Sequence, residues 1–394
     1  TLLTALSVSS GIFILVILMG ISAGIQKGVE SQFEEDATNR ISIWTGTTTK
    51  EFKGLNPGRY IQLKNADYNL LANTYDDYLE YRSPIFHIWG GSVNFKTQSG
   101  NYRIEGVYPD QQFIENETLV SGRFLNLSDV ETASKVAIIG HQVQKDLFKS
   151  APAIGTTIEI QGINFLVVGV YSDPGGAREE NRIFIPLTAA QKVFNGQDKL
   201  RSIAYTVKMS DDFDQAVALS GLVSNRMDQD LRQRHNVAPD DRSAVRVNNT
   251  LEEAKKIYSL IATIRGVFWF VGIGTIIAGI VGVSNIMLIV VKERTKEIGI
   301  RKALGALPWS IIAMILQEAI FVTSLAGFVG LFLGVGLLEL ISPMVDSDFI
   351  KHPQVDFNTA MTTVLLLIVA GALAGFVPAR RAANIKPIIA LRDE

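Results

Sequence analysis

A dense group of charged side chains, in the stretch VKERTKEIGIRKALGA at residues 291–306, has the most regular spacing for side-chain chemistry in this sequence. Oppositely charged residues four positions apart on a helix lie close enough to form ion pairs. Glu293, Glu297 and Arg301 follow one another at that interval, so a helix would place all three on one face. Such a row of charges favours recognition of another protein surface over bond-making catalysis.

Apolar residues are interspersed among these charges, namely Ile298, Ile300, Ala303 and Leu304. A short helix with apolar and charged groups on its surface is suited to docking a partner protein. A simpler interpretation is an anchor, because basic residues near the ends of membrane spans fix the cytoplasmic side. The candidate anchor residues are Lys292, Lys302, Arg380 and Arg381.

Motifs for catalysis and metal binding are missing from the sequence. It contains no G-x-x-x-x-G-K-[ST] phosphate loop, no H-E-x-x-H and no G-x-S-x-G. We therefore expect no enzymatic activity and no cofactor in this chain. The acidic pairs Asp76–Asp77 and Glu179–Glu180 are interpreted as solvated loop residues. The histidines are scattered and are interpreted as ordinary surface or packed side chains rather than metal ligands: His87, His141, His235 and His352.

The composition indicates a chain that is part membrane protein and part water-soluble protein. Apolar residues make up 47% of the 394 residues, and the formal net charge is −2. The first value is high for a wholly soluble protein, and the second gives no reason to expect nucleic-acid binding. Cysteine is absent, so neither disulfides nor thiolate chemistry is available.

Four charge-free runs are long enough to cross a bilayer, for which about twenty apolar residues are needed. The first is too long for a signal peptide and lacks a basic start, so we interpret it as a span. Whether a native N-terminal piece precedes Thr1 is left open. Glu318, just before the third run, is interpreted as a residue at the cytoplasmic edge near the basic stretch. The runs are residues 2–26, 266–291, 319–338 and 357–379.

Basic residues place the segment after the second span and the C-terminus in the cytoplasm, so the long insert after the first span lies outside. The predicted division is transmembrane helix 1 at 1–26, a stalk helix at 27–40, an α+β core domain at 41–248, a stalk helix at 249–265, transmembrane helix 2 at 266–291, a coupling segment at 292–308, transmembrane helix 3 at 309–341, an outer loop at 342–356, transmembrane helix 4 at 357–379 and a tail at 380–394.

The insert has the patterns of a mixed α and β domain. ISIWTGTTT alternates as a strand does, and KVAIIG and NFLVVGVY have the apolar character of buried strands. In SVNFKTQSGNYRIEGVY, the residues 99–101 predict a turn between two strands. The stretch at 211–235 predicts a helix, with Asp211 or Asp212 near its start. SDPGGAREENR is predicted to be a surface loop that lacks the spacing of a calcium site.

The junctions between spans and insert predict two amphipathic stalk helices. Apolar residues recur at helical spacing after the first span and before the second. Thr250 and Glu253 fit a capping box at the start of the second stalk. Each apolar stripe needs a partner in water, most simply the other stalk. The stalks are either rigid spacers or levers that move the outer domain. The stripes include Ile25, Val29, Phe33, Leu251, Ile257 and Ile261.

Small residues recur four positions apart in the spans and predict close helix contacts in the membrane. They are Gly20, Gly24 and Gly28, then Gly274, Ala278 and Gly282, then Gly330 and Gly334, then Gly371 and Gly375.

The basic stretch closely resembles the loop after the second span of MacB-type (FtsX-like) ABC transporter permeases. The C-terminal PARRAANIKPIIALR resembles the end of the same domain. SGRFLNLSDVETASKVAIIG, IGTTIEIQGINFLVVGVY and IFIPLTAAQ resemble that family's MacB-like periplasmic core. The resemblance covers essentially the whole chain. It implies an α-helical membrane protein with four transmembrane helices and a large mixed α+β periplasmic domain on two helical stalks, in a bacterial inner membrane with cytoplasmic termini.

The resemblance also implies a function. Such permeases dimerise and couple ATP hydrolysis by ABC ATPases, which bind ATP and Mg²⁺, to periplasmic movements by mechanotransmission. MacB-type proteins can carry the ATPase in the same chain, but these residues contain none, so the resemblance implies a separate ATPase subunit unless the given chain is a piece of a longer one. Efflux through a periplasmic adaptor and outer-membrane duct is the leading expectation. A mechanical regulator of a periplasmic partner, like the cell-division relatives, and a Lol-type lipoprotein-release permease remain alternatives. Carried over by position, the coupling residues are Glu293, Arg294, Glu297, Ile298, Arg301 and Gly305.

Overall fold

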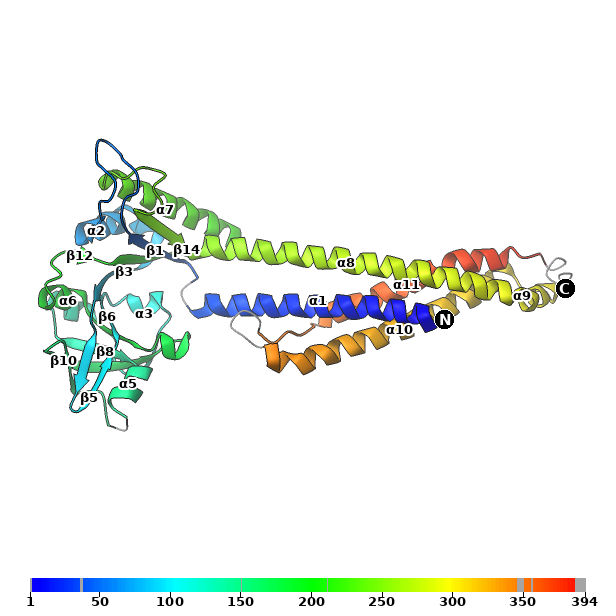
Figure 1. Ribbon diagram of the computed structural model, residues 1–394, viewed down its shortest axis with the longest axis horizontal. Helices are drawn as coiled ribbons and strands as arrows, with labels where there is room; N and C mark the ends of the chain where they lie inside the picture. The colour runs from blue at the N-terminus through cyan, green and yellow to red at the C-terminus, as the bar shows by residue number, and fades with distance from the viewer. Residues whose placement is uncertain are drawn as a thin grey trace. The chain divides into compact units, whose positions relative to one another are not determined.

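The computed structural model describes residues 2–35, 38–149, 151–210, 212–345, 351–355 and 357–386. The chain forms two compact units (Figure 1). We call residues 1–30 with 257–394 the helical unit, and residues 31–256 the sheet unit.

The helical unit consists of long apolar helices and one short helix. Four helices of the described chain are long and apolar enough to cross a membrane, and they contain the four charge-free runs, so this prediction is confirmed. The bounds are α1 (Leu2–Glu35), α8 (Thr250–Glu293), α9 (Thr295–Ala303), α10 (Pro308–Val345) and α11 (Phe357–Ala383).

Glycines hold α10 close to its two neighbours. A methyl group on Gly330 would collide with the backbone of Ser9 in α1, and one on Gly371 would collide with Thr323 in α10. Lipid provides little hydrophobic drive between helices, so such close van der Waals contact is what stabilises the packing. The predicted small-residue contacts are thus confirmed here. Gly274 differs, because no described atom lies within 4 Å of a methyl group placed on it.

The sheet unit contains a mixed sheet in the order β14-β1-β13-β3-β6-β11-β8-β10-β9-β4-β5, with β7 also paired to β10. A separate two-stranded sheet joins β12 to β2. The strands are β1 (Arg40–Thr45), β2 (Leu63–Lys64), β3 (Leu79–Ile88), β4 (Ser92–Phe95), β5 (Gln98–Asn101), β6 (Arg103–Val107), β7 (Thr118–Gly122), β8 (Val136–Gly140), β9 (Thr157–Ile160), β10 (Ile163–Ser172), β11 (Arg182–Pro186), β12 (Lys199–Leu200), β13 (Ser202–Val207) and β14 (Val245–Asn249).

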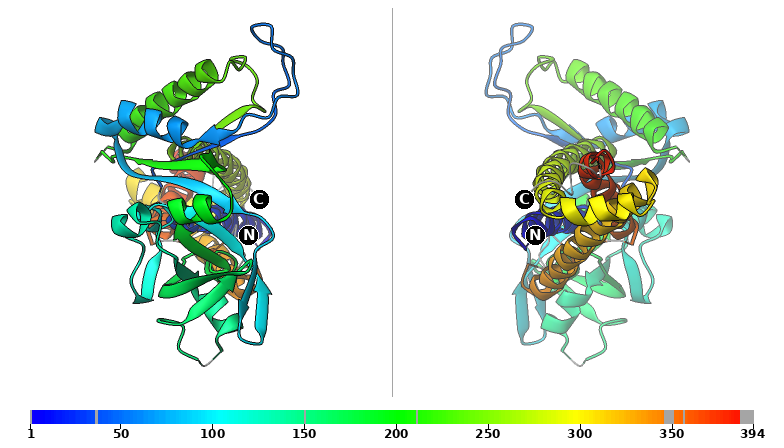
Figure 2. Two further views of the ribbon diagram at one scale, coloured as in Figure 1. Left: turned by 90° about the vertical axis from the view of Figure 1, so that its left-hand side faces the viewer. Right: turned by 90° about the vertical axis from the view of Figure 1, so that its right-hand side faces the viewer.

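Two large apolar cores lie along this sheet. One joins β1, β13 and β14 to α2 and α7, which lie beside that end of the sheet in Figure 1 and in the left view of Figure 2. The other surrounds β8, β9 and β10 with α5. The helices are α2 (Asn65–Thr74), α3 (Gln111–Ile114), α4 (Leu127–Glu131), α5 (His141–Leu147), α6 (Leu187–Val193) and α7 (Phe213–Arg234), with 3-10 turns η1 (Asp76–Tyr78) and η2 (Gly176–Arg178).

The predicted turn at residues 99–101 is wrong. Gln98–Asn101 form strand β5, which pairs with β4 so that Phe95 faces Gln98. The chain reverses instead at Lys96 and Thr97, where Lys96 has a φ of 51°. At Gly100 the ring of Tyr102 lies where a side chain would be, so a glycine fits this position of the strand.

The predicted start of α7 is confirmed, whereas that of α8 differs from the prediction. Asp212 caps α7 by accepting a hydrogen bond from the backbone N–H of Asp214, at 2.9 Å, whereas Asp211 lies outside the described residues. The predicted Thr250–Glu253 capping box is wrong by one position. The side chain of Asn249 accepts from the backbone N–H of Glu252, at 3.4 Å.

A charge cluster lies inside the sheet unit around Arg182 of β11. Its guanidinium pairs with Glu115, with 3.3 Å between Nη1 and Oε2, and with Glu179. Arg40 of β1 pairs with Glu115 from another side, at 3.0 Å. The interpretation of Glu179–Glu180 as a solvated pair is therefore wrong, since Glu180 is buried.

Glu117 lies in the same cluster, but neither of its carboxyl oxygens has a hydrogen-bond partner among the described residues. Burial raises its pKa well above the ordinary value, and the charges of Glu115 and Asp173 raise the pKa further. Arg182 acts in the opposite direction but does not cancel these effects. Glu117 is therefore held protonated in the folded unit at pH values where a solvated carboxyl would be ionised.

The first prediction concerns the α1–α10 contact. Gly330→Ala should destabilise the helical unit by about 1–3 kcal/mol, the usual range for overpacking. Gly336→Ala is the matched control on the same helix, because its added methyl group meets no described atom within 4 Å. Thermal unfolding in lipid nanodiscs measures both. Equal melting temperatures for the two variants would contradict the close contact.

The second prediction concerns Glu117. Folding raises the pKa of Glu117. The free energy of unfolding is therefore greatest at pH values below the pKa of this group in the unfolded chain, and it declines as the pH rises through the pKa in the folded protein. Glu117→Gln should remove this decline, so its melting temperature should exceed that of the wild type at pH 7 and equal it near pH 4. Each kcal/mol corresponds to about 2–4 °C. Exposed Glu131→Gln is the control. If the difference in melting temperature between the wild type and Glu117→Gln did not change with pH, the buried neutral carboxyl would be refuted.

Candidate coupling site at helix α9

Helix α9 is a separate short helix between α8 and α10. It runs across the right-hand view of Figure 2, in which α8 is seen end-on. Arg294 separates α8 from α9. The Thr295 hydroxyl shares its proton between the carbonyl oxygens of Val291 and Lys292 at the end of α8, at 3.1 and 2.8 Å. These bonds satisfy carbonyls that a helix end leaves without partners. Glu293 therefore ends α8 and lies on a different helix from Glu297. The prediction that Glu293, Glu297 and Arg301 line one face of a single helix is wrong for Glu293.

A glycine closes the other end of α9. Gly305 has a φ of +96°, a conformation that residues with a side chain rarely adopt. Its N–H bonds to the carbonyl of Lys302, and the N–H of Ala306 bonds to that of Arg301, at 3.1 and 3.0 Å. This pair of hydrogen bonds is the Schellman motif, which terminates helices. Gly305 thus fixes the length of α9 and the direction in which α10 begins.

Ion pairs connect α9 with the end of α8 and with α10. The Glu297 carboxylate accepts from Nε of Arg294 and from Nη2 of Arg301, both at 2.9 Å. Arg294 also reaches Glu318 of α10, at 3.1 Å. The hydrogen bonds from Arg294, and then those from Arg301, lower the pKa of Glu297. The sequence placed Glu318 near the basic stretch, and the structure brings the two together.

Lys302 connects α9 with α11. Its ammonium donates to the carbonyl oxygens of Ala383 and Ile385, at 2.6 and 2.7 Å. A cation at this position satisfies free carbonyls and complements the negative end of the helix dipole. The sequence treated Lys302 as an anchor only. No spacing rule could have found its partners, because they are backbone atoms of a distant segment.

The two sides of α9 differ in burial. Ile298 is 1% exposed and belongs to the apolar core of the helical unit. Leu304 is 83% exposed, and Trp309 at the start of α10 is 72% exposed. A groove of about 510 Å³ lies beside Leu304 and includes Arg301. This side of α9 therefore presents exposed apolar and charged groups together.

The other predicted site residues are placed less closely together. Arg380 and Arg381 lie exposed in the last turn of α11, and Lys292 is exposed near the end of α8. Among the described residues, no three side chains of metal-binding type form a cluster.

The predicted stalk residues also have different surroundings. Leu251 is buried against Ala216 and Val217 of α7, so its partner is not the other stalk. Ile261 is buried as well, and the side chain of Phe33 lies outside the described part of the chain. The half-buried members are Ile25, Val29 and Ile257.

Two family descriptions match the chain. The family described as the MacB-like periplasmic core domain matches residues 1–219. The family described as the FtsX-like permease C-terminal region matches residues 269–387.

Curated relatives match along the whole chain. The macrolide export ATP-binding/permease protein MacB of Bdellovibrio bacteriovorus is 27% identical over 406 residues, covering 100% of this chain and 60% of that protein. MacB 2 of Yersinia pestis is 29% identical over 398 residues, covering 100% of this chain and 56% of that protein. The chain thus spans less than two thirds of the length of these relatives. The solved periplasmic region of MacB from Actinobacillus actinomycetemcomitans is 19% identical, with a TM-score of 0.46, covering 58% of this chain and 97% of that one.

The third prediction concerns Lys302. Lys302→Met should leave the last carbonyls of α11 without their donor, so the backbone amides near residues 379–385 should exchange hydrogen faster. Lys296→Met is the matched control, because Lys296 is an exposed lysine of the same helix. Hydrogen exchange read by mass spectrometry measures both. Unchanged exchange in Lys302→Met would mean that the two hydrogen bonds do not hold the end of α11.

Proposed function

The chain belongs to the family of FtsX-like permeases with a MacB-like periplasmic core domain, and on that premise we propose that it is the permease subunit of an ABC transporter. These 394 residues contain no phosphate-binding loop, so ATP hydrolysis takes place outside them. We expect a separate ABC ATPase subunit that binds ATP and Mg²⁺, and we expect the permease to work as a homodimer. This chain itself is proposed to be no enzyme.

The surface of α9 is the observation that carries this proposal. Leu304 and Trp309 are largely exposed, and Glu297 is held between two arginines at fixed distances. Apolar groups supply affinity at an interface, whereas ordered charges supply orientation and specificity. An ATPase that docks here would contact both kinds of group at once. The proposed coupling residues are Glu293, Arg294, Glu297, Ile298, Arg301 and Gly305.

The contacts of α9 offer a route from the docking surface into the spans. Arg294 bonds to α10, and Lys302 bonds to the end of α11. A displacement of α9 would therefore act on two long helices through short, charge-assisted hydrogen bonds. Helix α8 runs from Thr250 to Glu293 and contains residues of both units, which supports mechanotransmission to the sheet unit.

The surroundings follow from the same proposal. The α9 side and the C-terminus would face the cytoplasm of a bacterium, with the chain crossing the inner membrane several times and contacting its lipids. The sheet unit would lie in the periplasm. There it would drive export of a substrate, in concert with a periplasmic adaptor and an outer-membrane duct. The names of the curated relatives, which include macrolide export, support efflux over mechanical regulation or lipoprotein release.

The fourth prediction tests the coupling. Glu297→Lys and Arg301→Glu should each lower permease-stimulated ATP hydrolysis by about tenfold while leaving the melting temperature nearly unchanged, because exposed ion pairs contribute little to stability. The measurement uses the permease with its co-purified ATPase in nanodiscs. The double variant Glu297→Lys, Arg301→Glu keeps an ion pair within α9 with its charges exchanged. We expect ATP hydrolysis to remain uncoupled from the permease in this variant. Normal hydrolysis and transport in both single variants would sink the coupling role.

The partner is identified by purifying the full chain in mild detergent and analysing the bound proteins by mass spectrometry. An ATPase subunit with a duct adaptor supports the efflux pump. An ATPase with a wall hydrolase would replace it with the regulator, and the absence of any ATPase would remove the permease function.

A further inference from the structure

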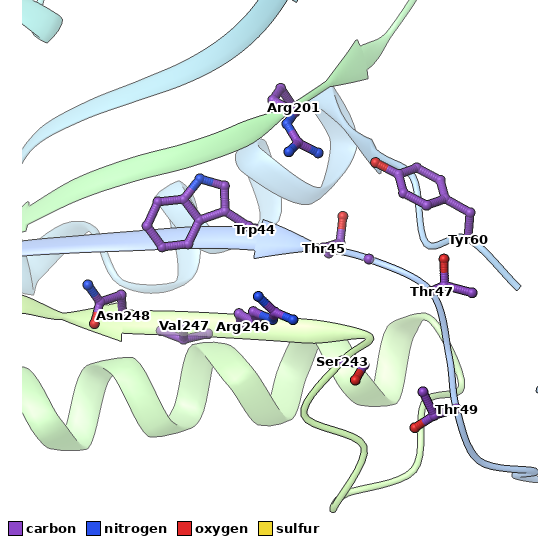
Figure 3. A pocket seen from close by; sticks show the side chains of 11 residues that line it. Trp44, Thr45, Thr47, Thr49, Tyr60, Arg201, Ser243, Arg246, Val247 and Asn248 are labelled. Atoms are coloured by element: carbon purple, nitrogen blue, oxygen red, sulfur yellow. The ribbon is translucent and has the colours of Figure 1, made fainter. Parts of the chain in front are cut away.

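A groove in the sheet unit has no role in the coupling described above. Its volume is about 840 Å³, and it lies where β1 and β14 meet the loop that follows β1 (Figure 3). Sites for small molecules are typically about 300–1,000 Å³ in volume. The walls come from β1, from β14 and from neighbouring loops, with Trp44 of β1 facing Arg246 of β14 and Arg201 standing just before β13.

Two arginines line this groove, and one of them, Arg246, also borders a neighbouring hollow that Asp228 and Glu252 line. In the described part of the chain, the side chains of Arg201 and Arg246 form no ion pair, and no carboxylate lines the groove. Many other arginines of the sheet unit do pair with a carboxylate: Arg40, Arg82, Arg103, Arg123, Arg182, Arg232 and Arg234. An anion that reaches both guanidinium groups would be stabilised by each of them.

Hydroxyl groups accompany the two guanidinium groups. In Figure 3 the hydroxyl of Tyr60 and the guanidinium of Arg201 point toward the same space, beside Trp44 and Thr45. Hydroxyls donate to anionic oxygens, and a guanidinium presents a planar fork that fits carboxylate, sulfate or phosphate groups. The chemistry of the lining therefore selects an oxyanion.

An aromatic hollow of about 290 Å³ adjoins this groove and shares Tyr60 and Arg201 with it. Its lining includes the rings of Phe86, Trp89 and Phe194. Trp89 is largely exposed although it is a large apolar side chain. Lys199 and His87 also line this smaller hollow, so basic groups and aromatic rings lie together along the joined surface.

We propose that the joined hollows bind a small anionic amphiphile, with its oxyanion held by Arg201 and Arg246 and its apolar body on Phe86, Trp89 and Phe194. Either a free organic acid or the headgroup region of an anionic phospholipid has this chemistry. Binding itself is independent of the coupling at α9. That the bound amphiphile is the transported substrate rests on the proposed function.

The test uses the full chain in phosphatidylcholine nanodiscs and two fluorescent probes with the same apolar ring system. Dansylglycine carries a carboxylate, and dansylamide carries no charge. We expect the anionic probe to bind more tightly, with energy transfer from tryptophan that falls in Trp89→Phe. Arg201→Gln with Arg246→Gln should weaken dansylglycine binding by at least about tenfold and leave dansylamide unchanged. Both side chains are exposed, so the variant should fold, and exposed Arg226→Gln of α7 is the control.

Competition distinguishes the sources of the ligand. If dihexanoyl phosphatidylglycerol displaces dansylglycine but dihexanoyl phosphatidylcholine does not, the ligand is the headgroup region of an anionic lipid. If only free organic acids displace it, the ligand is a free organic acid. Both outcomes support the proposal. Equal binding of the two probes, or full binding by the double variant, overturns it. Failure of dansylglycine to bind, together with loss of a co-purified acidic protein from the double variant, would make the groove a protein-docking surface instead. Because no ATPase is measured, these outcomes do not depend on the coupling at α9.

Discussion

The close approach of α10 to α1 and α11 is the constraint on which the helical unit depends. At Gly330 the backbones of α1 and α10 approach so closely that no side chain fits between them. At Gly371 the same is true of α11 and the Thr323 side chain. Where lipid offers apolar contact as favourable as another helix does, only such shape matching keeps particular helices together. The orientation of α10 then determines where Glu318 meets Arg294.

The end of the helical unit is organised by backbone groups that must find partners. Thr295 bonds to the carbonyls at the end of α8, Gly305 allows the turn that closes α9, and Lys302 bonds to the carbonyls at the end of α11. Each of these contacts satisfies polar atoms that would otherwise be costly to leave unpaired. The residues that could transmit force are therefore the same residues that make the helix ends stable.

Local pattern was sufficient to predict much of this architecture. The charge-free runs located the four apolar helices, alternation located β1, and short apolar runs located β8 and β10. Long-range pairing was not readable in this way. Ser99 and Gly100 have the composition of a turn, but they pair with β4 and are strand residues.

The same limit applies to the candidate sites. Glu297 and Arg301 are four residues apart, so their pairing on α9 follows from helix geometry. Lys302 and the carbonyl of Ala383 are joined only by the packing of two helices, and Arg201 and Arg246 share a groove only because β13 and β14 flank β1. No single-sequence pattern carries that information.

Helix α1 is made before the other helices of the helical unit, and it is also the apolar helix that this unit encloses most. Ile12 and Leu15 of α1 are almost completely buried, and Ser9 meets Gly330, which lies most of the chain away. On the ribosome, α1 therefore enters the membrane long before its partner exists, and its small and branched side chains face lipid in the meantime. Assembly of the helical unit is in this sense a late event, and α1 is exposed to wrong partners for as long as the sheet unit takes to be translated and folded.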